Sequence, residues 1–395
     1  MELLRPLNDS GFATQSVAYT GTDVQLTLAP AALPTQGLIN PNNVAVAING
    51  AVKAGASPNN FFPLFNLSAP AMGPALQGLT GEIHSSVDAI GFDSNDQFLR
   101  LMLNPHSALA RANSAKGVAL WGSGFGLARQ TFGDSTVVGS NDRHLHSSNL
   151  GMGLDFRNGN GLTLGVAGAW GKADTHFAAT TDSANADVTQ AGAYAIYDKP
   201  GVQLGLSLAY ADMKVATRRT VPIFANAVMS ARYGAHSWSA RAEAAKLITS
   251  DGKIDGEILA AYRHIAVSTS AFAESASSNA FAALNVAGRT ARSNRTELGL
   301  RASTARSLNA AASFYLQGSW AHEFNAGMTS VASISGLAGS SFTVFGAKAP
   351  ADSVLVRAGF NWKLSPQLSL GGRAEGEVSN GTREIGGMAQ ITYAF

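Results

Sequence analysis

The chain has 395 residues and no cysteine, and only 14% of its residues are charged, with 28 basic against 26 acidic side chains. A soluble domain usually carries about 25% charged residues, and the lack of cysteine excludes a disulfide-stapled secreted domain. The net charge of +2, without a basic run, argues against nucleic acid as a partner. A mean hydropathy of +0.06 is too low for a bundle of transmembrane helices. A transmembrane β-barrel remains compatible, because only alternate residues of its strands are apolar.

The beginning of the chain predicts a short β structure. Met1 to Pro6 lack the basic start and apolar core of a signal peptide. If the protein crosses the inner membrane, we therefore expect the sequence to be a fragment or Met1 to be a misplaced start. Residues 17–28 alternate between apolar and polar side chains around Gly21, which predicts two short strands joined by a turn.

The next part of the chain changes to a helical period. Residues 41–52 are compatible with a helix, and the apolar residues of 76–90 follow a 3/4/4/3 spacing that predicts one continuous helical face. Residues 94–97 fit a capping box, which predicts a helix that begins there and stops at Pro105. Residues 106–116 are rich in Ala and Ser, and we expect them to form a small-sided helix inside a pore.

From residue 117 onward, apolar side chains alternate with small or polar ones in segments of about ten or more residues. Such segments are long enough to cross a bilayer as tilted strands. Short turns between them alternate with long polar connections, as in an outer-membrane barrel. We therefore predict an all-β fold, a twelve-stranded antiparallel transmembrane β-barrel preceded by a short β/α-helical linker segment. The twelve segments are 117–129, 144–157, 161–173, 187–198, 202–215, 229–246, 253–268, 284–304, 310–324, 352–363, 367–378 and 383–395.

The two faces of these strands have different expected roles. Charges of both signs occupy the face opposite to the apolar one. In a soluble β-sandwich they would form the solvated outer face, but that fold does not explain the regular strand number. In a barrel they line a wet lumen. The expected pore-lining residues are Asp155, Arg157, Arg241, Glu243, Glu257, Arg263, Glu297, Arg301, Arg357, Arg373, Glu375 and Glu377. Aromatic residues of the outer face predict girdles at the membrane interfaces: Trp170, Tyr197, Tyr210, Trp238, Tyr262, Trp320, Trp362 and Tyr393.

The last strand ends on an aromatic residue. Ile391, Tyr393 and Phe395 share one face, and the alternate residues are small or polar. An exposed edge strand of this kind promotes aggregation in a soluble protein, whereas in a barrel it closes the sheet and turns its apolar face to lipid. We expect Ile391, Tyr393 and Phe395 to form the assembly signal of the barrel.

Four segments resemble those of autotransporters, the proteins of type V secretion. Residues 19–28 are similar to the closing rung of a passenger domain, and 79–86 to the Leu-Ser-Gly-Glu segment before the barrel. Residues 121–126 resemble the first barrel strand, and 391–395 the last. The resemblance implies a Gram-negative outer-membrane barrel with an α-helix in its pore, which exports its N-terminal passenger to the cell surface.

The resemblance also implies an organisation and a set of partners. Residues 1–35 would be the end of the passenger, 36–116 a helical linker and 117–395 the translocator barrel. Expected partners are outer-membrane lipid, the chain's own passenger and linker helix, the barrel assembly machinery and periplasmic chaperones. We expect a monomer without catalysis, cofactor or metal. No Asn-Asn dipeptide occurs in 77–116, so we do not expect cleavage by the route that uses one.

The pore charges suggest a mechanism. We hypothesise that they hold the linker helix after export and so plug the pore. Charge reversal at Arg357 and Arg373 would then raise ion leakage. The alternative function is a porin-like channel for small solutes, which would share the barrel but would not need residues 1–116.

Three further motifs have simpler interpretations. Gly133-Asp134-Ser135 matches the start of a hydrolase block in which Ser135 would be the nucleophile, but no Asp-x-x-His occurs in the chain, and a turn is favoured. His144 and His146 share a strand face and would make half a metal site; nothing near them completes it, so an interfacial pair is favoured. The glycines of 122–126 lack the context of a phosphate loop, and we expect them to leave room for the pore helix.

Overall fold

A computed structural model of the protein describes residues 13–104, 117–304, 311–325 and 327–395. The chain begins with the antiparallel hairpin of β1 (Ala13–Tyr19) and β2 (Val24–Pro30), which is the predicted pair of short strands. Four helices follow: α1 (Ile39–Lys53), α2 (Phe62–Phe65), α3 (Ala69–Gln77) and α4 (Ile83–Met102). Within these ranges, no helix is both long enough and apolar enough to cross a membrane.

From residue 117 onward, the described part of the chain forms the predicted barrel of twelve antiparallel strands. Each strand pairs with the next, and the pairings of β3 with β19 and of β8 with β9 complete the closure. The barrel therefore leaves no unpaired edge for lipid. Its strands are β3 (Gly117–Thr131), β4 (Arg143–Arg157), β5 (Leu162–Phe177), β6 (Ser183–Lys199), β7 (Val202–Val221), β8 (Ala227–Ser250), β9 (Ile254–Thr269), β13 (Arg289–Thr304), β14 (Ala312–Glu323), β17 (Asp352–Lys363), β18 (Leu368–Val378) and β19 (Thr382–Ala394).

The two ends of the barrel differ. At one end the connections are tight, as between β6 and β7 or between β17 and β18. At the other end the long connections carry a small sheet of β10 (Phe272–Ala273), β12 (Leu284–Val286), β15 (Thr329–Ile334) and β16 (Ser341–Phe345). The same connections contain β11 (Ser275–Ala276), which pairs with β8, and the 3-10 turns η2 (Pro222–Phe224) and η3 (Ala280–Ala282). We call this end the mouth.

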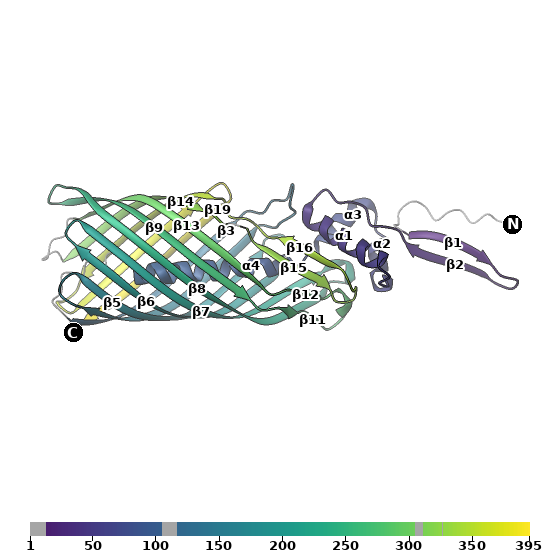
Figure 1. Cartoon of the computed structure of the whole chain (residues 1–395), viewed down its shortest axis with the longest axis horizontal. Coiled ribbons are helices and arrows are strands. Elements are labelled where there is room, and N and C mark those ends of the chain that lie inside the picture. Colours follow the sequence, from purple (N-terminus) through teal and green to yellow (C-terminus); the bar gives the residue numbers. More distant parts are fainter. Residues whose placement is uncertain (1–12, 105–116, 305–310, 326) are drawn as a thin grey trace.

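Helices α1 to α3 pack on the mouth together with the 3-10 turn η1 (Asn59–Phe61) (Figure 1). Their apolar side chains, including Ile48, Phe61 and Met72, form one buried cluster with loop residues such as Leu284 and Val344. Polar contacts add to this packing. The Asn40 side chain donates to the carbonyl of Phe345 at 2.8 Å and accepts from its N–H at 2.9 Å. The helical segment and the mouth loops thus form one packed body.

The helix predicted over 76–90 is interrupted. Helix α3 ends at Gln77, and α4 begins only at Ile83. Between them Gly81 has φ of +66°, a left-handed conformation that side chains disfavour. The capping box at 94–97 is also wrong as a helix start, because Ser94 lies in the middle of α4. The break between α3 and α4 is five residues long, and it lies where the chain turns from the mouth into the barrel (Figure 1).

The outer face of the barrel carries the predicted aromatic side chains, which are all exposed. Trp170, Tyr210, Tyr262 and Trp320 each lie eight positions along their strands from the first residue at the tight-turn end. Eight positions correspond to roughly 26 Å along a strand, and to about 20 Å along the axis at a tilt of about 40°. Tyr197, Trp362, Tyr393 and Phe395 lie near the tight-turn end itself. The apolar band between these two levels matches a membrane-spanning barrel.

Candidate functional site

The lumen of the barrel is filled by α4 (Figure 1), and all twenty residues of this helix are buried. The sequence of α4 is not that of an ordinary core helix, because it contains Asp88, Asp93, Asp96 and Arg100. Buried charges are strongly unfavourable unless they are paired and hydrogen-bonded. The inner wall of the barrel must therefore supply partners to the helix, and it does so differently on two sides.

Strands β4 to β8 form the close-packed side. Small inward residues let the helix approach. A β-carbon at Gly192 would lie 2.8 Å from the Met102 methyl, and one at Gly151 would lie 3.3 Å from a Leu101 methyl. Asn95 donates to the Ser237 hydroxyl at 2.7 Å, and Gln97 donates to the Ser147 hydroxyl at 2.8 Å. The helix thus meets this wall through apolar packing and short polar contacts.

Strands β3, β9, β13, β14 and β17 to β19, together with Arg241 of β8, form the charged side, where long charged side chains connect the helix to the wall. Asp96 lies 2.9 Å from Arg100 on the next helical turn, 3.3 Å from Arg263 and 3.8 Å from Arg241. One turn earlier, Asp93 lies 3.2 Å from Arg129 of β3. These contacts join the helix to strands β3, β8 and β9.

The wall charges also pair with one another. Glu297 receives bidentate contacts from Arg241, with 2.9 Å at the shorter, and lies 3.0 Å from Arg357. Glu375 lies 3.4 Å from Arg357 and 3.3 Å from Arg100. The Glu375 carboxylate therefore connects Arg357 of the wall to Arg100 of the helix. A cavity of about 40 Å³ lies at this level below the end of α4 and includes Arg100, Arg357 and Arg373 in its lining, which is room for one or two water molecules.

A further group of buried polar residues surrounds the point where the chain enters the barrel. Glu82 accepts from the Asn141 backbone N–H at 2.9 Å and from its side chain at 2.6 Å. Burial outweighs these hydrogen bonds and raises the pKa of Glu82 to about 8. Asp88 holds Arg289 in a bidentate contact of 2.9 and 3.0 Å. The mouth therefore fixes the first turns of α4 from two directions.

Glu274 of the β9–β13 connection is the centre of a second mouth contact. It lies 2.6 Å from Arg219 and 2.7 Å from His84 at the start of α4. Burial opposes the ionisation of Glu274, but Arg219 and His84 together hold the pKa of its carboxyl well below the usual range. An ionised, fully partnered carboxylate thus links α4, β7 and the loop between β9 and β13.

Each residue expected in the pore lies on the inner face of its strand. All are buried except Glu243, whose side chain is 31% exposed near the tight-turn end and contacts Arg241. Arg301 pairs with Glu257 at 2.6 Å. Asp155 accepts from the Tyr194 hydroxyl, which itself accepts from the Trp121 indole at 2.8 Å.

Sequence reasoning missed other members of this lumen. Arg129, Arg295 and Glu384 share the inward parity of their strands, so the same alternation would have found them. The charges of α4 were missed for another reason. Charged residues on a helix usually indicate a solvated face, and only the surrounding barrel shows that they are buried.

Several expectations need correction. Gly122 and Gly124 are on the exposed outer face, so they do not make room for the helix; Gly151 and Gly192 do. The pore helix that the structure describes is 83–102, and the segment 106–116 lies outside the described residues. Ser135 is exposed in a turn, where Asp134 accepts from the backbone N–H groups of residues 136 and 137, hydrogen bonds that lower its pKa.

Comparisons with known proteins agree with this architecture. The model of the autotransporter beta-domain family matches residues 120–375. The structure is similar to the translocator domain of the autotransporter NalP from Neisseria meningitidis, with a TM-score of 0.62 and 13% identity over 79% of this chain and 98% of that one. It is also similar to the beta domain of the Bordetella autotransporter BrkA, with a TM-score of 0.51 and 16% identity over 71% and 100% of the two chains. A search of curated protein sequences finds no match.

Proposed function

Because the chain belongs to the autotransporter beta-domain family, it is an outer-membrane translocator unit that exports a passenger to the cell surface, and we propose that α4 closes its pore after export. The observation that carries this proposal is the pairing of the α4 charges with the barrel wall. Asp93, Asp96 and Arg100 each lie within 3.3 Å of an oppositely charged group on a wall strand. A helix held by these contacts occupies the path that an exported chain must take.

The division of the chain follows from the same proposal. Residues 1–35 would be the end of the passenger, whose described part is the β1–β2 hairpin. Residues 36–116 would be the linker, and 117–395 the translocator. The hairpin and the helical segment lie beyond the mouth, and α4 runs back into the barrel (Figure 1). This path is the one expected of a linker that has followed its passenger outward.

Assembly of the barrel would use the last strand. The side chains of Ile391 and Tyr393 are exposed on the outer face of β19, which pairs with β3 at the closing seam, and Phe395, directly after the strand, is exposed as well. The N–H of Phe395 donates to the carbonyl of Val118 at 2.9 Å, which supports a role of this end of the chain at the seam. We propose that the barrel assembly machinery binds this apolar face, after periplasmic chaperones have delivered the chain as a monomer.

The export route is tested with a signal peptide and an N-terminal epitope tag fused to the full chain. Intact cells are treated with protease. We expect loss of the tag while the barrel remains protected and heat-modifiable. A tag that is protected in intact cells, but cut after permeabilisation of the outer membrane, would place the N-terminal region in the periplasm and favour a porin-like channel.

The closing role of α4 is tested separately by conductance in planar bilayers. Arg357→Glu and Arg373→Glu place a negative charge beside Glu375 and, at Arg373, remove the hydrogen bond to the carbonyl of Arg100. We expect higher ion leakage than in the unchanged protein. Unchanged conductance in both variants would contradict the proposal that the wall charges hold the plug.

A further inference from the structure

A second group of polar side chains lies on the outer face of the barrel near the mouth, away from the lumen. Strand β4 presents His144 and His146, and the adjacent strand β5 presents Asp174 and His176. The register places His146 opposite Asp174 and His144 opposite His176. Since alternate residues share one face, the four side chains form a two-by-two array. The carboxylate that sequence reasoning did not find near His146 is thus supplied by the neighbouring strand.

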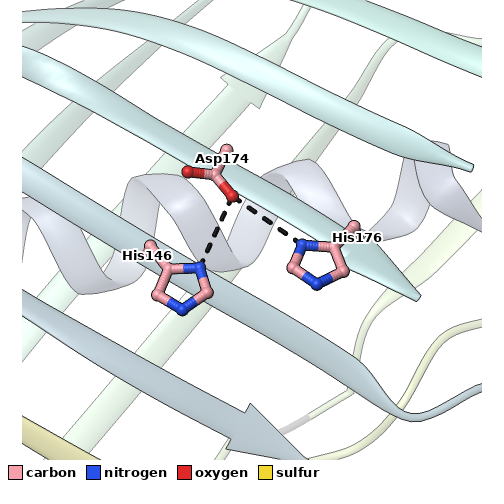
Figure 2. Close-up of side chains that lie close together, drawn as sticks. All are labelled: His146, Asp174 and His176. Atoms are coloured by element: carbon pink, nitrogen blue, oxygen red, sulfur yellow. Dashed lines mark ion pairs between the residues drawn. The ribbon is translucent and has the colours of Figure 1, made fainter. Parts of the chain in front are cut away.

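Three of these side chains converge (Figure 2). The Nδ1 atom of His146 lies 3.5 Å from the Oδ2 atom of Asp174, and the Nδ1 atom of His176 lies 3.8 Å from the same oxygen. One ligand atom from each residue lies within 4.8 Å of the others. In a tetrahedral site with bonds of about 2.0–2.1 Å, two ligand atoms are roughly 3.3 Å apart. Small side-chain rotations would therefore bring the three atoms to coordination distance.

The position of the array leaves it open to an ion. Asp174 and His176 lie four and six positions beyond Trp170 toward the mouth, above the apolar band. The side chains of His146, Asp174 and His176 are 53%, 48% and 45% exposed. Lys172, two positions before Asp174 on β5, lies 3.9 Å from Asp187 of β6, which partly offsets the charge of the lysine.

The flanking strands carry no charged residue at the four register positions opposite the array. Across the register from β4, strand β3 presents Ala128 and Gln130; across from β5, strand β6 presents Asn185 and Ser183. No cation at these positions would compete with a bound metal ion for Asp174.

We propose that His146, Asp174 and His176 bind a divalent transition-metal ion of the Zn²⁺ class. Two imidazole nitrogens and one carboxylate oxygen suit zinc, whereas Ca²⁺ and Mg²⁺ require mainly oxygen ligands. Three protein ligands leave a coordination position that faces the solvent. The ring of His144 stacks on that of His176 with centroids 5.3 Å apart, so a fourth imidazole lies next to this position. The ion would tie β4 to β5 above the membrane and offer an exposed coordination position on the cell surface.

The test is a calorimetric titration of the folded full chain in detergent with ZnCl₂. The variants are His146→Ala, Asp174→Asn and His176→Ala. The matched control is His322→Ala, because His322 and Asp352 form an outward pair at 2.9 Å with the same chemistry; among the described residues, only the His146, Asp174 and His176 group has three convergent ligand atoms. All four side chains lie on the outer face, so we expect their replacement to leave the barrel folded. Heat-modifiability of each variant verifies this.

We expect one ion per chain, affinity that falls by at least about tenfold in each of the three variants, and no change in the control. The spectrum of bound Cu²⁺ should show coupling to two imidazole nitrogens, reduced to one in His146→Ala. Absence of saturable binding, or equal binding by His322→Ala and His176→Ala, would overturn the proposal.

Discussion

Replacement of Asp96 by Asn should release α4 from the barrel wall far more often than in the unchanged protein. Asp96 is nearly fully buried and contacts Arg100, Arg263 and Arg241 at 2.9, 3.3 and 3.8 Å. At an effective dielectric constant of about 20, each contact contributes roughly 4–6 kcal/mol of attraction before desolvation. Most of that attraction is offset by the cost of burial, and removing one partner of a buried pair typically costs about 3–5 kcal/mol. The ratio of released to docked helix should rise by about 100-fold to several thousand-fold.

The chain has no cysteine, so a single introduced thiol reports on the helix alone. Ser94 is fully buried near the centre of α4, and Ser94→Cys changes the size of its side chain little. The assay is the rate at which a maleimide labels this thiol in the folded barrel, with and without Asp96→Asn. The labelling rate follows the population of the released helix when docking is fast.

The control for this prediction is Asp187→Asn. Asp187 also forms an ion pair, with Lys172 at 3.9 Å, but both side chains are largely exposed. Exposed pairs contribute only about 0–1 kcal/mol, so labelling should change by less than roughly fivefold. Equal rates in Asp96→Asn and in the unchanged protein, with the barrel still heat-modifiable, would refute the idea that these charges hold the helix.

Three further predictions concern the mouth and the seam. Gly81→Ala should destabilise the docked linker by about 1–3 kcal/mol, because Gly81 has φ of +66° and a β-carbon there would lie 2.4 Å from a Leu284 methyl. Urea titrations measure this loss. The control is Gly50→Ala in α1, which should not destabilise the protein because a β-carbon at Gly50 would meet open space. The buried Glu82 has its pKa raised to about 8, so the folded mouth holds a proton that the unfolded chain loses above its ordinary pKa. Stability should fall by up to about 1.4 kcal/mol per pH unit from pH 4.5 to 8 and then level off, and unfolding of Glu82→Gln should lack this dependence. Deletion of Phe395 should lower the yield of folded barrel in outer-membrane fractions, and normal yield would contradict its role in assembly.

The strands were predictable because the barrel imposes a local rule on them. A residue between lipid and a wet lumen must be apolar on one face and polar on the other, and that alternation is visible over ten residues without knowledge of any partner. The predicted segments agree with the twelve strands of the structure, and Trp170 and Tyr393 are exposed on the outer face as expected. Glu297 and Arg357, two charged residues of the inward parity, are buried.

The linker was less predictable because the barrel wall surrounds α4, so the usual amphipathic pattern of a helix does not apply to it. An amphipathic pattern assumes water on one side, but α4 is buried on all sides. Its acidic residues were therefore not recognised as buried partners. The break at Gly81 was hidden because the apolar spacing continues across it.

The barrel is encoded locally, since strand number, the orientation of each face and the closing terminal strand follow from periodicity along the chain. The pairing of the charges depends on the folded barrel, because Asp96 and Arg263 are far apart in sequence and come together only when the sheet closes around α4. The folded barrel also brings His146 and Asp174 side by side, because the register between β4 and β5 places them opposite each other. Pairing between strands is a property of the closed sheet, and no single strand contains it.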